Sequence, residues 1–261
     1  MTAAAPVGRI EIDGEAATVA RLSAAAPAGY GHFTAMQVRG HRVRGLDLHL
    51  ARLDAANREL FGAGLDPATV RAHIRHAVGG GTGDASVRVY VCEMLGSPSV
   101  IVTVRPPGGM PAGPWRLQTV PYQRTLAHIK HLGDFGQGYF QRLAHRNEFD
   151  EALLTGPDGV ISEGSITNIA FFDGDGILWP AAPALDGITM QLLERQLPAR
   201  DVPSRRTPVS VSGLRSFRGA FVTNARGIAP VGQIDDLSLP VDGTLLATLA
   251  EAYESAGWDP I

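Results

Sequence analysis

The sequence predicts an α/β (α+β) protein of two domains. Runs of alternating apolar residues, which indicate strands, are interspersed with segments whose apolar residues recur at helical spacing. The segment PPGGMPAGP at 106–114 is dense in proline and glycine and interrupts both patterns. The length of 261 residues suffices for two domains of ordinary size. We therefore expect domains at 1–108 and 117–261, joined by a linker at 109–116, with the functional site in the cleft between them.

Turn signals and apolar spacing locate the elements of the first domain. Asp13-Gly14 indicates a hairpin, Arg39-Gly40 indicates a turn between two further strands, and Pro67 is typical of a first helical residue. The expected elements are, in order, a hairpin within 9–20, two strands within 30–45, helices at 46–62 and 67–78, a loop at 79–84, and strands at 85–93 and 98–105.

The second domain shows the same mixture. The turn at Pro157-Asp158-Gly159 reverses the chain after one strand, and Gly187 precedes a helix that starts near Thr189. The expected strands are 115–121, 150–155, 168–172, 176–179 and 219–223, and the other expected helices are 136–147 and 242–256.

Composition excludes several functional classes. Apolar content of 44%, charged content of 19% and a net charge of -3 are ordinary for a globular protein and give no electrostatic reason to expect nucleic acid or an anionic membrane as a partner. No apolar run approaches the roughly 20 residues needed to span a bilayer, and the N-terminal residues lack the features of a secretory signal. A single cysteine, Cys92, cannot form an internal disulfide. We expect a cytoplasmic protein.

Lys130 is the only lysine among 23 basic residues. It lies in the apolar context AHIKHLG, and burial of an amine lowers its pKa and makes it competent to form a Schiff base. The alternative is a surface lysine on a loop.

Glu163 follows two apolar residues and precedes Gly164 and Ser165. A carboxylate there is either a turn residue or a charge positioned for chemistry. If it faced a pyridine nitrogen, it would keep that nitrogen protonated, and the ring would act as an electron sink.

Three further segments could bind an anion. Asp186-Gly187-Ile188-Thr189 opens a helix, whose first N–H groups and dipole attract negative charge. Arg52, on the first helix, could form a fork onto a phosphate. The turn at 223–227 follows a strand and could present backbone donors. The alternatives are helix capping, a solvated arginine and a simple turn.

Several familiar motifs are absent from the sequence. It contains no phosphate-binding G-x-x-x-x-G-K-[ST], no G-x-S-x-G around Ser165 and no H-E-x-x-H, and one cysteine cannot anchor a zinc ribbon. We assign no metal.

Taken together, these segments resemble the class IV aminotransferases, the pyridoxal-phosphate (PLP) enzymes of fold type IV. The match consists of separate elements in the family's order across nearly the whole chain: YGHFTAMQ at 30–37, HLAR at 49–52, Lys130, DEALL at 150–154, Asp158-Gly159, EGSITN at 163–168 and LDGITMQ at 185–191.

The resemblance implies roles for individual residues. Lys130 would carry PLP through a Schiff base and move the proton, and Glu163 would pair with the pyridine nitrogen. Leu185 would pack on the ring. The phosphate would be bound by Arg52, Ile188, Thr189, Asn224 and Ala225. A homodimer is also implied. Lysine is required at position 130 because a guanidinium does not deprotonate to a nucleophile.

The substrate-binding pattern departs from the family. Thr34 and Gln37 stand where F-E-x-x-R has glutamate and arginine, and the strand at 87–94 lacks the arginine that D-amino acid transaminases use after it. Candidates for substrate contact are Phe33, Gln37, Arg39, Arg88, His131 and Arg226, which the sequence does not rank.

We hypothesise transamination from a D-amino acid, with (R)-primary amines as further donors, to 2-oxoglutarate or pyruvate. The alternatives are an aminodeoxychorismate lyase, a branched-chain L-amino acid transaminase, a non-catalytic PLP-binding protein and a cofactor-free Schiff-base enzyme.

Overall fold

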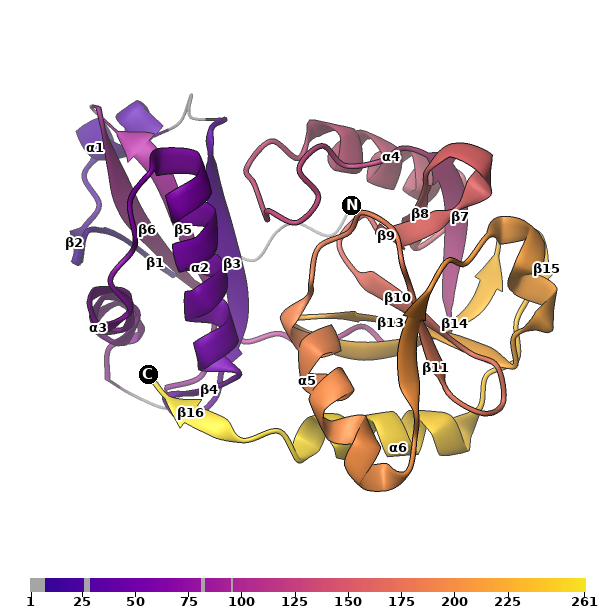
Figure 1. The fold of residues 1–261 in the computed structure, drawn as a ribbon. Helices are drawn as coiled ribbons and strands as arrows, with labels where there is room; N and C mark the ends of the chain where they lie inside the picture. The colour runs from indigo at the N-terminus through magenta and orange to yellow at the C-terminus, as the bar shows by residue number, and fades with distance from the viewer. Residues whose placement is uncertain (1–7, 26–28, 81–82, 95) are drawn as a thin grey trace. The chain divides into compact units, whose positions relative to one another are not determined.

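The computed structural model describes residues 8–25, 29–80, 83–94 and 96–261, which form two compact units (Figure 1). Unit 1 contains the described residues up to Gly108 together with Ile129–Gly133 and Gly257–Ile261. Unit 2 contains Gly109–His128 and Asp134–Ala256. Each unit has its own hydrophobic core.

Unit 1 is built on a five-stranded antiparallel sheet in the order β2-β1-β6-β5-β3. Its elements are β1 (Arg9–Ile12), β2 (Glu15–Ala16), α1 (Val19–Ala25), β3 (Gly31–Val38), β4 (Arg42–Arg44), α2 (Leu46–Phe61), α3 (Pro67–Val78), β5 (Ala85–Met94), β6 (Ser97–Arg105) and β16 (Trp258–Pro260).

Local sequence explains most of these elements. Asp13 and Gly14 both have positive φ, as a two-residue hairpin turn between β1 and β2 requires. The Asp66 side chain accepts hydrogen bonds from the backbone N–H groups of Ala68 and Thr69, and Pro67 is the first residue of α3.

Alternation along β3 and β5 separates the two faces of the unit 1 sheet. Met36, Val38 and the odd-numbered valines of β5 pack against α2 and α3. The opposite face carries Phe33 and Gln37 of β3 with Arg88 and Tyr90 of β5. Towards the far end of this face, Cys92 and Met94 form a smaller cluster with residues of α1 and with Leu132.

Unit 2 is built on a mixed sheet in the order β12-β11-β10-β13-β14-β7-β8-β9, with β15 paired to β14. Its strands are β7 (Trp115–Pro121), β8 (Glu151–Thr155), β9 (Ile161–Gly164), β10 (Asn168–Phe172), β11 (Ile177–Pro180), β12 (Ser204–Thr207), β13 (Gly219–Asn224), β14 (Gly227–Ile234) and β15 (Leu237–Ser238). Its helices are α4 (Phe135–Arg146), α5 (Ile188–Gln196) and α6 (Gly243–Glu254), with short 3-10 turns at Pro157–Gly159, Leu197–Arg200 and Val211–Ser216.

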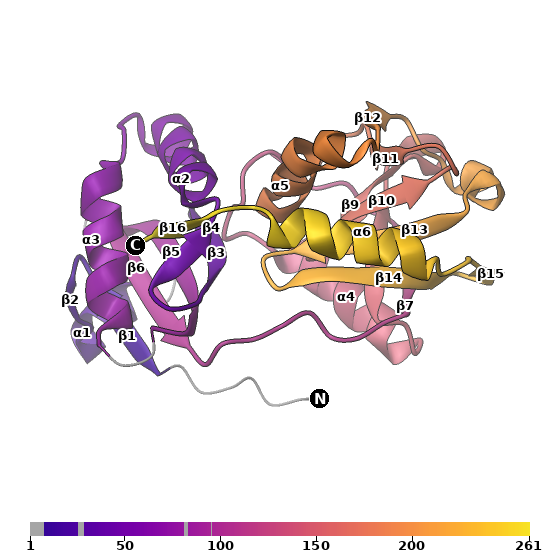
Figure 2. The same cartoon turned by 90° about the horizontal axis from the view of Figure 1, so that it is seen from below.

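The sheet of unit 2 rolls back on itself, since the edge strand β9 lies against β10 and β11. Its enclosed face is a core that includes Leu117, Leu153, Phe171 and Val231. On the other side, α5 and α6 lie side by side over β13 and β14 (Figure 2), and α4 covers the parallel pair β7 and β8.

The structure contains elements that the sequence did not predict. The most instructive is β14, where Pro230 lacks an N–H donor and the register shifts between Val231 and Gln233. Because proline and glycine are atypical of strands, their presence explains why the sequence did not predict β14, the longest strand of unit 2. The others are α1, β9, β12, β15 and β16.

The position of Lys130 also differs from the expectation. It was expected in the second domain, but residues 129–133 belong to unit 1 by their contacts. The reason is a short backbone pairing, in which Phe33 N donates to Lys130 O at 2.8 Å and Leu132 N donates to Gly31 O at 2.9 Å.

Among the residues described, no helix combines the length and apolarity needed to cross a bilayer.

Candidate active site

Lys130 lies beside the edge strand of the unit 1 sheet. The backbone pairing with β3 fixes the chain on both sides of it. Gly31 permits close approach on both sides of β3, because a Cβ atom there would clash with the carbonyl oxygen of Val91 on β5 and would crowd the side chain of Leu132, two residues after the lysine. The half-buried lysine places its Nζ 4.7 Å from the centre of the Phe33 ring. An amine is thus held against an aromatic face at a defined point of the sheet.

The same face of unit 1 carries an exposed arginine. Arg88 Cζ lies 6.0 Å from the centre of the Phe33 ring, and its Nη1 donates to the Tyr90 hydroxyl at 3.3 Å. Phe33 and Tyr90 stack with ring centres 5.4 Å apart. Lys130 and Arg88 therefore flank one aromatic platform.

Gln37 is engaged elsewhere on this face. Its side-chain oxygen accepts hydrogen bonds from Arg39 and from the backbone of Gly108, and its nitrogen donates to Ser86. Arg39 also donates to the carbonyl oxygen of Gly108. This pair ties β3 to the end of the first unit, which is a structural role.

The remaining substrate candidates differ in position. His131 follows the lysine and forms a backbone bridge to His32 in unit 1. Arg226 belongs to unit 2, where its side chain donates to the carbonyl oxygen of Gly109 at 2.9 Å.

Arg52 extends from α2 and is half-buried. No carboxylate of the described residues forms an ion pair with its guanidinium. Its Nη2 donates to the hydroxyl of Thr34, and its Nε is buried without a partner. Burial lowers the pKa of Arg52 to about 10. An unsatisfied guanidinium of this kind suits an anion such as a phosphate.

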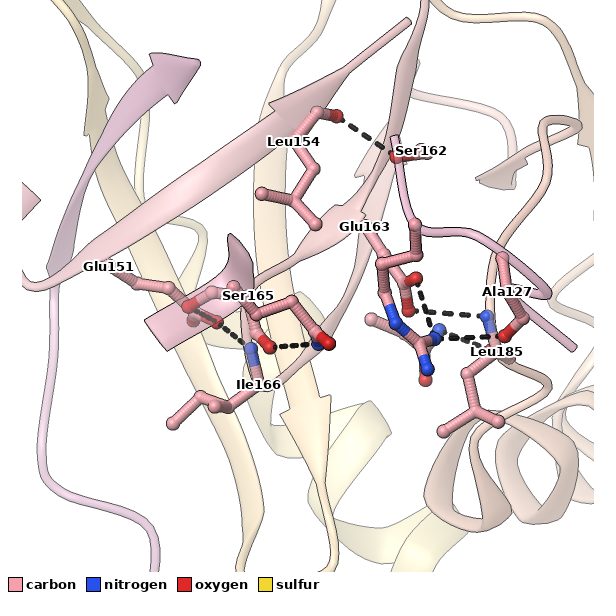
Figure 3. Close-up of polar contacts among 11 residues, drawn as sticks. Ala127, Glu151, Leu154, Ser162, Glu163, Ser165, Ile166 and Leu185 are labelled. Atoms are coloured by element: carbon pink, nitrogen blue, oxygen red, sulfur yellow. Dashed lines mark hydrogen bonds and ion pairs between the residues drawn. The ribbon is translucent and has the colours of Figure 1, made fainter. Parts of the chain in front are cut away.

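Glu163 is buried at the end of β9 in unit 2. Its Oε1 lies 3.1 Å from Arg124 Nη1, and its Oε2 accepts a hydrogen bond from the backbone N–H of Leu185 at 3.2 Å. Arg124 also donates to the carbonyl oxygen of Ala127. Figure 3 shows Glu163 beside Ala127 and Leu185. The carboxylate is held on both oxygens by groups from different parts of the chain.

A second buried carboxylate fixes the loop that follows Glu163. Glu151 accepts hydrogen bonds from the backbone N–H of Ile166 and from the hydroxyls of Ser165 and Thr167. Figure 3 shows Glu151 with Ser165 and Ile166, separate from Glu163 and its partners. Burial raises the pKa of Glu151 to about 7, and the three donors oppose that rise.

The predicted phosphate segments of unit 2 are bonded to each other. Thr189, on the first turn of α5, donates its hydroxyl to the carbonyl oxygen of Asn224 at 2.7 Å. The Asn224 side chain accepts from the backbone N–H of Arg226, which closes the turn around Ala225. Ile188 begins the helix, whose first N–H groups have no acceptor within it. The helix start and the turn together fit an anion.

The side chain of Asn168 contacts both Leu185 and Gly187. The Asn168 side chain donates to the carbonyl oxygen of Leu185 at 2.7 Å. A Cβ atom on Gly187 would collide with the oxygen of the same amide. Glycine is thus required before α5 by close packing, since its φ of -65° is ordinary.

The structure gathers the predicted residues in two sets. In unit 1, Lys130, Phe33 and Arg88 lie together. In unit 2, Glu163 is bonded to Leu185, and Thr189 to Asn224. Sequence reasoning did not identify Arg124, Glu151 or Asn168 as part of the site. Glu151 and Asn168 lie within the motifs DEALL and EGSITN, but no role was assigned to them, because each of the three residues acts through a partner distant in sequence. Among the described residues, no group of three or more metal-ligating side chains could hold a metal ion.

The chain is similar in sequence and in fold to known aminotransferases. The sequence model of the amino-transferase class IV family matches residues 31–234. A hypothetical aminotransferase from Mycobacterium tuberculosis, in its PLP-bound form, is 21% identical, with a TM-score of 0.77 over 89% of this chain and 90% of that one.

Two further solved structures are similar. A fold IV-transaminase from Curtobacterium pusillum is 23% identical, with a TM-score of 0.77 over 88% of this chain and 87% of that one. A branched-chain aminotransferase from Thermoproteus uzoniensis is 20% identical, with a TM-score of 0.84 over 95% of this chain and 94% of that one. A search of curated protein sequences finds no match.

Proposed function

The chain belongs to the class IV aminotransferases, which use PLP, and we propose that it transfers an amino group from a D-amino acid to a 2-oxo acid such as 2-oxoglutarate or pyruvate. (R)-primary amines are further donors in this proposal. One observation carries it: the only lysine of the sequence lies against Phe33, with the exposed guanidinium of Arg88 on the same ring. An amine and a cation so placed suit a substrate with both an amino group and a carboxylate.

Lys130 holds the coenzyme covalently and moves the proton at the substrate carbon. Its amine can do both, whereas an arginine at this position could not lose a proton. The coenzyme, when bound, supplies a pyridine ring that takes up an electron pair. Glu163 accepts the ring N–H, and Arg124 and Leu185 hold that carboxylate in place.

The remaining residues bind and orient. Arg52 contributes an unpaired guanidinium to the phosphate, and Ile188, Thr189, Asn224 and Ala225 contribute helix-start and turn donors. Leu185 packs on the ring. Phe33 forms a wall of the substrate site, Arg88 binds the carboxylate and His131 borders it, whereas Gln37 acts by holding β3 in place.

The strand β5 is not followed by the arginine that D-amino acid transaminases commonly use for the substrate carboxylate, and this departure motivates the relaxed specificity that includes (R)-primary amines. A branched-chain L-amino acid donor is the second candidate. It is favoured by the likeness to branched-chain aminotransferases, whose fold matches over 95% of this chain with a TM-score of 0.84.

The test of the proposal uses the purified full chain supplied with PLP. We expect a violet-end absorption band that borohydride bleaches, with peptide mapping that locates the attached coenzyme on Lys130. Lys130→Ala and the charge-preserving Lys130→Arg should both lose the band and the turnover. A variant that retains either would contradict the assigned role of Lys130.

A donor panel identifies the substrate. We expect turnover of D-amino acids with 2-oxoglutarate or pyruvate. Turnover of L-leucine and L-valine alone would assign the enzyme to the branched-chain group. Pyruvate release from aminodeoxychorismate without an acceptor would identify a lyase, and a coloured protein without turnover would be a binding protein.

The proposal includes a homodimer. Light scattering of the holoenzyme should give twice the chain mass of 27.6 kDa, and a monomeric mass under assay conditions would contradict it.

A further inference from the structure

Three polar side chains lie between β3 and α2 in unit 1: Thr34, His49 and Arg52. Thr34 is fully buried and His49 is 3% exposed. The Thr34 hydroxyl lies 2.7 Å from His49 Nδ1 and also accepts a hydrogen bond from Arg52 Nη2. One hydroxyl therefore contacts both of the nitrogen side chains on the helix.

The chemistry of these groups fixes the direction of the hydrogen bond between Arg52 and Thr34. A guanidinium can only donate, so the Thr34 oxygen must accept from Arg52. The Thr34 hydroxyl retains one proton and a second lone pair for the contact with His49 Nδ1, and it donates to that nitrogen when the neutral ring carries its proton on Nε2. Burial and the nearby Arg52 charge hold the pKa of His49 well below its ordinary value, which agrees with a neutral ring.

This arrangement leaves the charge of Arg52 uncompensated by its neighbours. Its contacts are a hydroxyl and, behind that, a neutral imidazole, and burial is the cause of its lowered pKa. The buried Nε still lacks an acceptor. The class IV pattern has a glutamate at position 34, where this chain has Thr34. The residue that accepts the hydrogen bond from Arg52 is therefore neutral. The guanidinium is oriented without being neutralised, which suits a doubly charged phosphate.

We propose that Thr34, supported by His49, is a positioning residue that fixes the Arg52 guanidinium for the phosphate of PLP. This inference rests on the proposed function, in which Arg52 binds that phosphate. Thr34 and His49 act through Arg52 and do not touch the coenzyme.

The test compares two ligands of the apoprotein that differ only in the phosphate: PLP and pyridoxal. Thr34→Val preserves the shape of the side chain and removes the hydroxyl. We expect the affinity for PLP to fall roughly tenfold, the loss typical of a hydrogen bond to a charged group, while the affinity for pyridoxal stays unchanged. The phosphate preference, which is the ratio of the two affinities, therefore falls by the same factor.

Thr103 supplies the matched control. It is a buried threonine of the same sheet whose hydroxyl has no partner. Thr103→Val should leave the phosphate preference of the wild type intact. Thr34→Ser and His49→Asn retain a hydroxyl and an acceptor near the Nδ1 position, and both should retain most of that preference.

The outcomes separate the inference from the proposed function. A wild-type protein that binds neither ligand, or binds both equally, overturns the proposed function. An unchanged preference in Thr34→Val, or an equal loss of both affinities, overturns the inference alone. If circular dichroism shows that Thr34→Val does not fold, the phosphate preference of Thr34→Ser and His49→Asn is measured in its place. A tenfold loss of that preference in both variants would contradict the proposed role of Thr34 and His49.

Discussion

The Arg124 guanidinium and the Glu163 carboxylate form a buried ion pair, with 3.1 Å between Nη1 and Oε1 and side chains only 3% and 6% exposed. Their separation in sequence is 39 positions. Removing a charge from water into a low-dielectric interior is costly, and the attraction between the two side chains offsets part of that cost. The pair thus fixes the position of the carboxylate that we propose as the partner of the pyridine nitrogen.

Breaking this pair should be costly. In Arg124→Met the buried Glu163 carboxylate loses its ion pair with Arg124, and we expect the free energy of unfolding of the apoprotein to fall by about 3–5 kcal/mol. Urea denaturation measures the loss. The double variant Arg124→Met/Glu163→Leu should lose less, because no uncompensated charge remains.

The exposed pair of Arg58 and Asp54 is the control for that prediction. Its atoms are 2.9 Å apart, but the Arg58 side chain is 65% exposed. Arg58→Met should change the free energy of unfolding by at most about 1 kcal/mol. Equal losses at the two arginines would show that burial of the Arg124 pair has no energetic consequence.

Glu151 should make the protein less stable at alkaline pH. Its folded-state pKa of about 7 lies above the ordinary 4.5, so its contribution to stability is fully present below about pH 4.5 and is lost as pH rises through 7. The shift corresponds to roughly 3 kcal/mol. Glu151→Gln, which cannot ionise, should flatten the dependence of the free energy of unfolding on pH between 5 and 8. A variant with the wild-type slope would contradict the assignment to Glu151.

His32 and His49 should destabilise the protein in acid. Burial lowers the pKa of both rings in the folded state. Their contribution to stability is present above the unfolded value of about 6.5 and is lost as pH falls below it. Urea denaturation of His49→Asn between pH 7 and 5 should show a shallower loss than the wild type. His145→Asn, at an exposed position, should not.

Gly187→Ala tests the loop before α5. The added methyl group would collide with the Asn168 side chain, which supports Leu185. We expect a loss of about 1–3 kcal/mol in the free energy of unfolding and weaker binding of PLP.

The first residue of α6, Gly243, provides the comparison, because a Cβ atom there meets nothing within 4 Å. Gly243→Ala should be neutral or slightly stabilising, as alanine favours a helix over glycine. If both substitutions proved neutral, the packing requirement at Gly187 would be refuted.

Local signals in the sequence determined the elements that depend on neighbouring residues. The hairpin at Asp13-Gly14 and the start of α3 at Asp66 and Pro67 need no distant partner, and the structure confirms both. The family elements around Lys130 and Glu163 were also readable, and the match of the family model over residues 31–234 confirms the family. The chemistry of the protein was therefore accessible from residue types and their order.

Only the tertiary structure decided which distant groups meet. Strand β16 pairs with β4 across more than 200 residues, Arg124 reaches Glu163, and Thr34 joins His49 to Arg52. No periodicity or turn signal encodes such contacts, because they arise when chain segments pack and buried polar groups must find partners. The sequence thus named the candidate amine, carboxylate and arginine, while packing determined the neighbours that position them.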